Sequence, residues 1–147
     1  MVRSLTLVAG NQQTAEESVQ DAFERAFVRW RRISGYDDPV AWIRRVAINR
    51  IRDHGRREGR RFRALERLRG ESVTSVEPLH TVELTDVLME LPRQQRAAAA
   101  LFYVEGLPVT DVAAAMGVSE GAVKYHLNKA RERLRPLLSA DAEESSA

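Results

Sequence analysis

The sequence predicts an all-α protein built from two small helical modules that a flexible linker joins. Glycine and proline punctuate the chain, and no stretch shows the alternation of apolar and polar residues that is typical of a β-strand. Apolar residues recur at helical spacing in two parts of the chain, and residues 70–81 between them show no periodicity. We expect a first module at residues 1–69, an acidic linker at 70–81, a second module at 82–138 and a disordered tail at 139–147.

The first module is predicted to contain a long amphipathic helix near its start. Thr14 and Glu17 have the spacing of a capping box, which marks a helix N-terminus. An apolar stripe follows over about five helical turns and consists of Val19, Ala22, Phe23, Ala26, Phe27, Trp30 and Ile33. The opposite face carries Gln20, Asp21, Glu24 and Arg25.

A second helix of the first module is predicted to follow the loop at residues 34–38. Asp38 is a candidate N-cap, and Pro39 suits the first helical position. The helix is expected to reach residue 54 or 55 and can continue through the arginine cluster beyond. One face is apolar and should join the core, with Ile43, Val46, Ala47 and Ile51.

Another face of the same helix combines an aromatic ring, guanidinium groups and an amide. Trp42, Arg45, Asn49 and Arg52 follow one another at helical spacing, which places them in line. Groups of this kind stack on and hydrogen-bond to unpaired bases, so we interpret this face as a platform for single-stranded nucleic acid. The alternative is that Trp42 is an ordinary core residue and the arginines are solvated.

The second module is predicted to begin with two helices. The first covers residues 82–91 and is stopped by Pro92, and the second covers residues 93–105 and is closed by Gly106. Each module has only about sixty residues, so each core is marginal, and packing between the modules or onto a partner would add stability.

Residues 107–134 predict a helix-turn-helix. Gly117 can take the positive φ that the turn requires, and Ser119 is a good N-cap for the second helix. The apolar stripe of that helix leaves a polar surface free, with Ser119, Glu120, Gly121, Lys124, Tyr125, Asn128, Lys129 and Arg131. A helix of this kind lies in a DNA major groove. The alternative is an ordinary helical hairpin with a solvated face.

The net charge of +2 conceals blocks of opposite sign. Residues 25–69 carry fifteen arginines against five acidic residues, whereas residues 70–92 carry five acidic residues and no lysine or arginine. A strongly basic segment favours a polyanion over a small acidic metabolite as partner. Because arginine far outnumbers lysine, forked contacts to phosphates and base edges are favoured, and the alternative is that the excess of arginine reflects only a GC-rich genome.

The residues do not support an enzyme. The chain has no cysteine and three scattered histidines, and no carboxylate spacing suggests an acid–base pair, so we expect no catalysis, no metal site and no cofactor. No apolar run is long enough to cross a membrane, and the start lacks the apolar core of a signal peptide. We therefore expect a cytoplasmic protein without membrane insertion.

Three segments resemble the extracytoplasmic-function class of bacterial sigma factors. AEESVQDAFERAFVRW resembles region 2.2 of that family, and DDPVAWIRRVAINRIRDHGRR resembles regions 2.3 and 2.4. LPRQQRAAAALFYVEGLPVTDVAAAMGVSEGAVKYHLNKARERL resembles region 4. A lone region 4 would be weak support, because many regulators share its helix-turn-helix, but here both halves occur in order. The likeness covers residues 4–138 and implies a region 2-like first module and a region 4-like second module.

The resemblance implies a non-catalytic subunit that directs core RNA polymerase to specific promoters. The face formed by Gln20, Asp21 and Glu24 would dock on the clamp of the β′ subunit, and the second module would meet the β flap. The acidic linker would thread the basic channels of the polymerase. The free protein is expected to be held by an anti-sigma factor.

The resemblance also implies two promoter DNA contacts. The surface of Trp42, Arg45, Asn49, Arg52 and Arg56, with the loop at residues 34–38, would bind the minus-ten element and flip out one base. The helix from Ser119 would read the minus-thirty-five element, with Lys124, Tyr125, Asn128 and Lys129 as contacts.

One departure from the family pattern keeps other functions open. Members of this class usually have a further helix ahead of the LTLVAG stretch, and by this comparison that helix is expected to be missing. A truncated decoy that binds polymerase or an anti-sigma factor without initiating is therefore one alternative. A stand-alone helix-turn-helix regulator of duplex DNA is the other.

Overall fold

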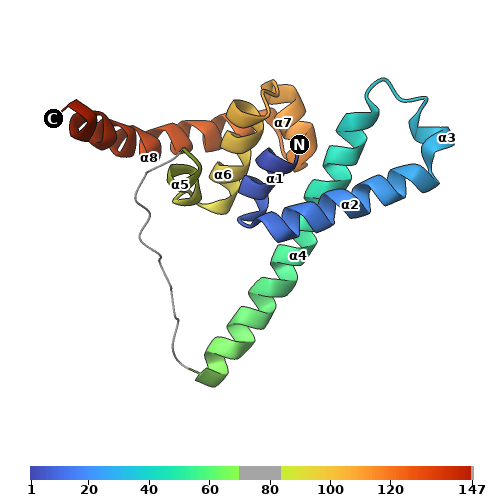
Figure 1. The fold of residues 1–147 in the computed structure, drawn as a ribbon, viewed down its shortest axis with the longest axis horizontal. Coiled ribbons are helices and arrows are strands. Elements are labelled where there is room, and N and C mark those ends of the chain that lie inside the picture. The colour runs from blue at the N-terminus through green and yellow to red at the C-terminus, as the bar shows by residue number, and fades with distance from the viewer. Residues whose placement is uncertain (70–83, 147) are drawn as a thin grey trace.

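The computed structural model describes residues 1–69 and 84–146 and confirms the all-α class. Helices α1 to α4 form the first module and α5 to α8 the second, and the two modules lie against each other (Figure 1). The expected linker at residues 70–81 lies outside the described residues.

The first two helices meet at a tight corner. Helix α1 (Val2–Ala9) ends at Gly10, whose φ of 82° is left-handed, and α2 (Gln12–Val28) begins immediately afterwards. The Asn11 side chain accepts a hydrogen bond from the Thr14 amide at 2.8 Å, so Asn11 is the N-cap. The predicted capping box at Thr14 and Glu17 is therefore wrong, because the helix starts two residues before Thr14.

The predicted apolar stripe is only partly buried. Val19, Ala22 and Ala26 are in the core, but Phe23 and Trp30 are half exposed and Phe27 is 84% exposed. The helix also breaks after Val28, and a short α3 (Trp30–Ile33) follows. The stripe is wider than the surface that the neighbouring helices cover, so its aromatic edge remains in solvent.

The long helix α4 (Pro39–Arg69) carries the basic segment away from the body of the molecule (Figure 1). The Asp38 carboxylate accepts a hydrogen bond from the Ala41 amide at 3.0 Å, which confirms the predicted N-cap. Ile43, Ala47, Ile48 and Ile51 point into the core. The helix passes through Gly55 without interruption.

The second module begins with α5 (Leu84–Met89) and α6 (Arg93–Ala99). A π-helical turn, η1 (Ala100–Val104), continues α6, and the Glu105 amide donates to the Ala100 carbonyl at 3.0 Å. Helices α7 (Val109–Met116) and α8 (Glu120–Ser146) complete the module. Residues 139–146 continue α8, whereas the composition predicted a disordered tail there.

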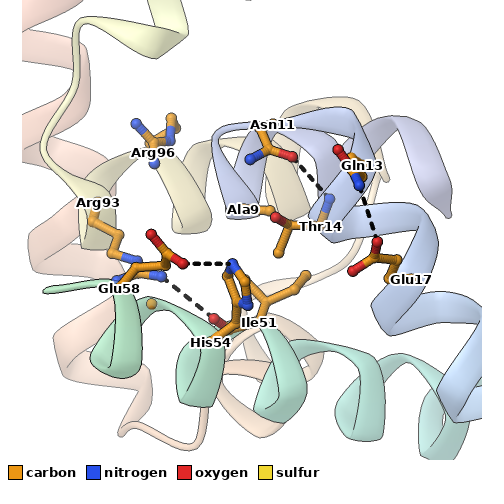
Figure 2. A pocket seen from close by; sticks show the side chains of 11 residues that line it. Ala9, Asn11, Gln13, Thr14, Glu17, Ile51, His54, Glu58, Arg93 and Arg96 are labelled. Atoms are coloured by element: carbon orange, nitrogen blue, oxygen red, sulfur yellow. Dashed lines mark hydrogen bonds and ion pairs between the residues drawn. The ribbon is translucent and has the colours of Figure 1, made fainter. Parts of the chain in front are cut away.

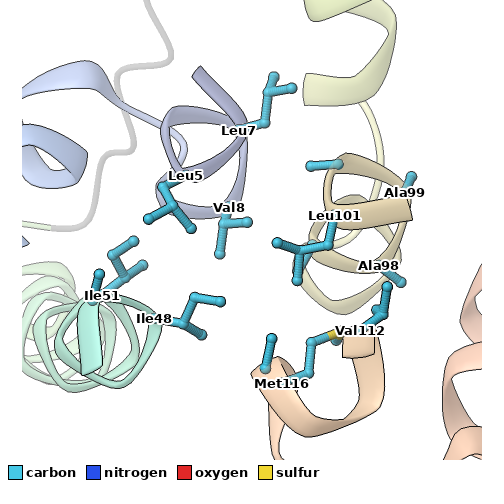
Figure 3. Packing of buried hydrophobic residues seen from close by; sticks show 14 of the residues in the cluster. Leu5, Leu7, Val8, Ile48, Ile51, Ala98, Ala99, Leu101, Val112 and Met116 are labelled. Atoms are coloured by element: carbon cyan, nitrogen blue, oxygen red, sulfur yellow. The ribbon is translucent and has the colours of Figure 1, made fainter. Parts of the chain in front are cut away.

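The two modules share one apolar core. Val8 of α1 and Ile48 of α4 face Leu101 of η1 and Met116 of α7 across the boundary (Figure 3). Leu5 and Leu101 are fully buried. Packing between modules is thus the additional burial that two small cores require.

Glu105 ties the modules together electrostatically. Its carboxylate accepts a hydrogen bond from the Ser4 hydroxyl at 2.6 Å, and it lies 3.5 Å from the Arg44 guanidinium and 3.6 Å from the Met1 ammonium. Burial raises the pKa of Glu105, but the Ser4 hydroxyl, the ammonium and Arg44 together outweigh burial, so the net pKa lies below its ordinary value.

We expect the variant Glu105→Gln to lose part of the stability of the folded protein and to show a weaker dependence of that stability on acid pH. A carboxylate with a lowered pKa stabilises the fold above its unfolded pKa of about 4.3, and this contribution disappears as the pH falls through the folded value. At neutral pH the loss should be roughly 1.5–3 kcal/mol, as for hydrogen bonds to charged groups. Urea unfolding at a series of pH values measures the free energy of unfolding of the parent and the variant. The same dependence of this free energy on pH in both proteins would contradict the prediction.

Candidate nucleic-acid interface

Helix α8 presents a polar face beside its buried stripe. The Ser119 hydroxyl accepts a hydrogen bond from the Ala122 amide at 3.1 Å, and Gly117 has a φ of 68°, so both predicted turn features are confirmed. Val123, Leu127 and Ala130 are buried against the module. The polar positions Ser119, Glu120, Gly121, Lys124, Tyr125 and Asn128 are exposed.

Two of the predicted recognition residues also make contacts within the module. The Arg131 guanidinium donates to the Tyr103 hydroxyl at 2.6 Å and to the Asn128 side chain at 3.2 Å. The Lys129 ammonium lies 3.4 Å from Glu132 and 5.9 Å from the centre of the Tyr125 ring. These contacts hold the side chains over the surface of α8. Among the cations predicted to contact DNA from this helix, Lys124 is the one that forms no hydrogen bond or ion pair within the described part of the chain.

The face of α4 that the sequence singled out is continuous but unevenly exposed. Arg45, Asn49 and Arg56 are exposed, whereas Trp42 is half-buried and packs on the core. Arg52 is also half-buried, and burial, followed by repulsion from Arg56 and Arg93, lowers its pKa. Part of this platform therefore faces the second module.

The face predicted to bind polymerase contains an internal ion pair. Gln20 and Glu24 are exposed. Asp21 forms ion pairs with Arg50 and with Arg25, and the hydrogen bond from Arg50 lowers the pKa of Asp21 despite opposing burial. Asp21 thus also fixes α2 against α4.

Sequence reasoning missed an aromatic component of this face. Phe23, Phe27 and Trp30 follow at helical spacing along α2 and α3 and are all more than half exposed. Phe27 lies one turn beyond Glu24 on the same side of the helix. Periodicity could not reveal this exposure, because a buried and an exposed apolar stripe have the same pattern.

The described residues show neither a metal-binding cluster nor a membrane span. Among them, no group of three or more histidines, aspartates or glutamates is close enough to hold an ion. Within residues 1–69 and 84–146, no helix has the length and apolar character required to cross a bilayer.

Comparison with known proteins matches both modules. Residues 1–61 match sigma-70 region 2, and residues 81–134 match sigma-70 region 4. The ECF RNA polymerase sigma factor SigM of Bacillus subtilis is 30% identical over 92% of this chain and 86% of its own length. RNA polymerase sigma-E factor of Streptomyces coelicolor is 32% identical over 95% of this chain and 80% of its own. SigE of Mycolicibacterium smegmatis is 31% identical, but the match spans only 57% of that protein.

A solved structure is similar over almost the whole chain. It is the sigma factor RpoE of Bartonella quintana in complex with the anti-sigma factor NepR, with a TM-score of 0.75 and 24% identity over 95% of this chain and 90% of that one. This similarity concerns the fold. On the sequence matches, the chain belongs to the sigma-70 family, in the ECF class of RNA polymerase sigma factors.

Proposed function

We propose that this chain directs core RNA polymerase to specific promoters, where the first module opens the minus-ten element and the second reads the minus-thirty-five element. One observation carries the proposal: two surfaces with nucleic-acid-binding chemistry, on α4 and on α8, lie on different modules of one chain. Each contact is weak alone, and the covalent connection makes the second contact effectively intramolecular.

The second module supplies duplex recognition. Helix α8 would enter the major groove with Lys124 and Asn128 at base edges and Tyr125 and Lys129 at the border of the groove. Each good bidentate contact discriminates by about 1–3 kcal/mol. The same helix would contact phosphates through the side chains of Ser119 and Arg131 and through the backbone amides of Glu120 and Gly121, because these positions flank the base-reading residues.

The first module supplies strand opening. Extruding a base costs a few kcal/mol, and an aromatic ring that stacks on an unpaired base returns about 1–3 kcal/mol. Trp42 would provide the ring, Asn49 a hydrogen-bonding amide, and Arg45, Arg52 and Arg56 the contacts to the phosphates. The free energy gained by binding the single strand to this platform therefore offsets the cost of melting.

The polymerase would dock mainly on α2. Gln20, Asp21 and Glu24 offer polar contacts, and the exposed rings of Phe23 and Phe27 add the apolar centre that stable interfaces contain. We assign this surface to the β′ clamp and the second module to the β flap. An anti-sigma factor would compete for these surfaces in the free protein.

We expect the variant Trp42→Ala to impair promoter opening about tenfold on duplex DNA and much less on a template melted in advance, since the lost stacking energy is of the order of 1–3 kcal/mol. The readout is open-complex formation by holoenzyme on the two templates. Val40→Ala serves as the control, because Val40 is an exposed apolar residue on the same helix. Equal defects on both templates would mean that Trp42 only supports the core.

Run-off transcription with purified core polymerase tests the whole proposal. A promoter-specific transcript that requires this chain is the expected result. Core binding without a transcript would identify a decoy, and tight binding to duplex DNA without core binding would identify a stand-alone regulator. Either outcome would overturn the proposal.

A further inference from the structure

One arginine of helix α8 joins two uncharged side chains. Figure 2 shows Arg93 and Arg96 at a cavity of about 580 Å³ between α2, α4 and α6, where each donates to a backbone carbonyl. The Arg131 guanidinium instead donates through Nε to the Tyr103 hydroxyl at 2.6 Å and through Nη1 to Oδ1 of Asn128 at 3.2 Å. Arg131 thus connects η1 to a polar side chain on the helix assigned to DNA.

A π-helical turn presents Tyr103 to this arginine. In η1 the Leu101 carbonyl loses its α-helical partner, and the Leu107 amide donates to it at 3.0 Å instead. Leu101 is fully buried, whereas Tyr103, two residues later, is half exposed, and the centre of its ring lies 5.8 Å from the Arg131 guanidinium carbon. π-Helical turns often occur at functional sites. This turn provides a hydroxyl beside α8 while η1 stays anchored in the core.

The donor-only chemistry of arginine fixes the orientation of the Asn128 amide. A guanidinium group has no acceptor, so the Asn128 atom that faces Arg131 has to be the carbonyl oxygen. The amide nitrogen forms no hydrogen bond in the described part of the chain, and the side chain is exposed. Asn128 consequently presents two N–H donors to a ligand that approaches α8.

The Tyr103 hydroxyl holds Arg131 in the position that this orientation requires. Arg131 is exposed, and a long exposed side chain loses rotamer freedom when it is kept in one conformation. Its hydrogen bond to the hydroxyl is the shorter of the two, and a short hydrogen bond from a charged donor is the stronger kind. Without the hydroxyl, Arg131 leaves Asn128, and the amide can rotate by half a turn.

The orientation of the amide decides which bases it accepts. In the major groove, guanine, adenine and thymine each present an acceptor, whereas cytosine presents only an amino donor. An amide that presents N–H donors binds an acceptor, and a cytosine amino group would meet another donor. The Asn128 oxygen does not serve cytosine either, because the positive charge of Arg131 beside it repels a second donor hydrogen.

We propose that Tyr103, acting through Arg131, fixes Asn128 as a hydrogen-bond donor and thereby excludes cytosine at one position of the minus-thirty-five element. The inference rests on the proposed function, in which α8 reads duplex DNA. Tyr103 is a positioning residue, because it acts on the base through two other side chains. The guanidinium has five N–H donors, and those that remain serve a neighbouring phosphate.

The variant Tyr103→Phe removes the hydroxyl and retains the ring. Holoenzyme with parent or variant transcribes a promoter library that has a randomised minus-thirty-five element, and sequencing of the transcribed templates gives the base preference at each position. We expect the parent to disfavour cytosine at one position and Tyr103→Phe to weaken this discrimination by roughly threefold to tenfold, the value of one hydrogen bond. The other positions should keep their preferences, whereas a general loss of stability or affinity would not act on one position alone.

Two further variants assign this position to Asn128. Asn128→Asp replaces the amide by a carboxylate, which only accepts, so cytosine should become the preferred base at the same position. Arg131→Ala should weaken the discrimination as Tyr103→Phe does, and combining these two changes should have no further effect. Arg133→Ala, exposed on the side of α8 opposite to Arg131, should leave the whole profile unchanged.

A measurement on the free chain tests the contact itself. Hydrogen exchange of the Arg131 Nε–H, followed by ¹⁵N NMR, should be faster in Tyr103→Phe by roughly threefold to tenfold. Unchanged exchange would overturn the inference, and so would an unchanged base profile when the parent holoenzyme selects promoters; both results leave the proposed function intact. A parent holoenzyme that selects no minus-thirty-five sequence would overturn the proposed function and this inference with it, although the exchange rates would be unaffected.

Discussion

Replacing Lys124 and Asn128 together with alanine is expected to lower promoter-specific transcription by about 100-fold, since each base contact is worth roughly 1–3 kcal/mol and 1.4 kcal/mol corresponds to a factor of ten. Both side chains are exposed on α8, outside its buried stripe, so the fold should be unaffected. Run-off transcription from a promoter that the parent holoenzyme selects from genomic fragments is the measurement. Association with core polymerase should be retained.

Arg133→Ala is the matched control for this pair. Arg133 is exposed on the same helix but lies about 180° around the helix axis from Lys124, at 3.6 residues per turn. It therefore removes one positive charge from the opposite side of α8. If Arg133→Ala lowers transcription as much as the double variant does, the positive charge of α8 matters and not its groove contacts. If the double variant loses core binding to the same extent as transcription, the role assigned to α8 is wrong.

The variant Leu101→Ala is expected to destabilise both modules at once. Leu101 is fully buried in η1 at the boundary, against α1, α4 and α7 (Figure 3). Truncating a buried leucine costs about 2–5 kcal/mol, which is a large part of the stability of a small protein. We expect the melting temperature to fall by roughly 5–15 °C.

The positions of the tryptophans make this variant diagnostic. Trp30 and Trp42 both belong to the first module, whereas Leu101 belongs to the second. If the modules share one core, the transition seen by tryptophan fluorescence shifts together with the transition seen by far-UV circular dichroism. A tryptophan transition that stays in place would show that the modules unfold independently. Val28→Ala, at a residue that is 82% exposed, should shift neither transition.

Local features of the fold could be predicted from the sequence. The caps at Asp38 and Ser119 and the left-handed turn at Gly117 depend on a few neighbouring residues, and all three are confirmed. The helix-turn-helix could be predicted for the same reason, because its turn and both apolar stripes are local. The cap at Asn11 was missed because Thr14 and Glu17 offered a competing pattern three residues later.

Features that depend on what covers a surface could not be predicted. The aromatic edge of α2 follows the period of a buried stripe, but the structure places no helix over Phe27. The π-helical turn η1 adds one residue per hydrogen-bonded turn, which no periodicity shows at this length. The composition of residues 139–146 indicated disorder, yet the helix that Ser119 begins extends through them.

The sequence predicted which residues form the candidate site better than it predicted how buried their side chains are and what they contact. The platform on α4 and the polar face of α8 lie where helical spacing put them, and their roles in binding remain predictions. The half-burial of Arg52 and the engagement of Arg131 by Tyr103 arise from tertiary contacts, across the module boundary in one case and 28 residues apart in the other. No pattern within one helix carries that information.

Association with core RNA polymerase is the property on which the proposed function depends. Purified chain and core enzyme are mixed and separated by size-exclusion chromatography. We expect them to elute as one complex, and we expect Glu24→Ala combined with Phe27→Ala to weaken this complex, while Arg133→Ala does not. Separate elution of the folded chain and the core enzyme would show that the chain is not a sigma factor that binds polymerase.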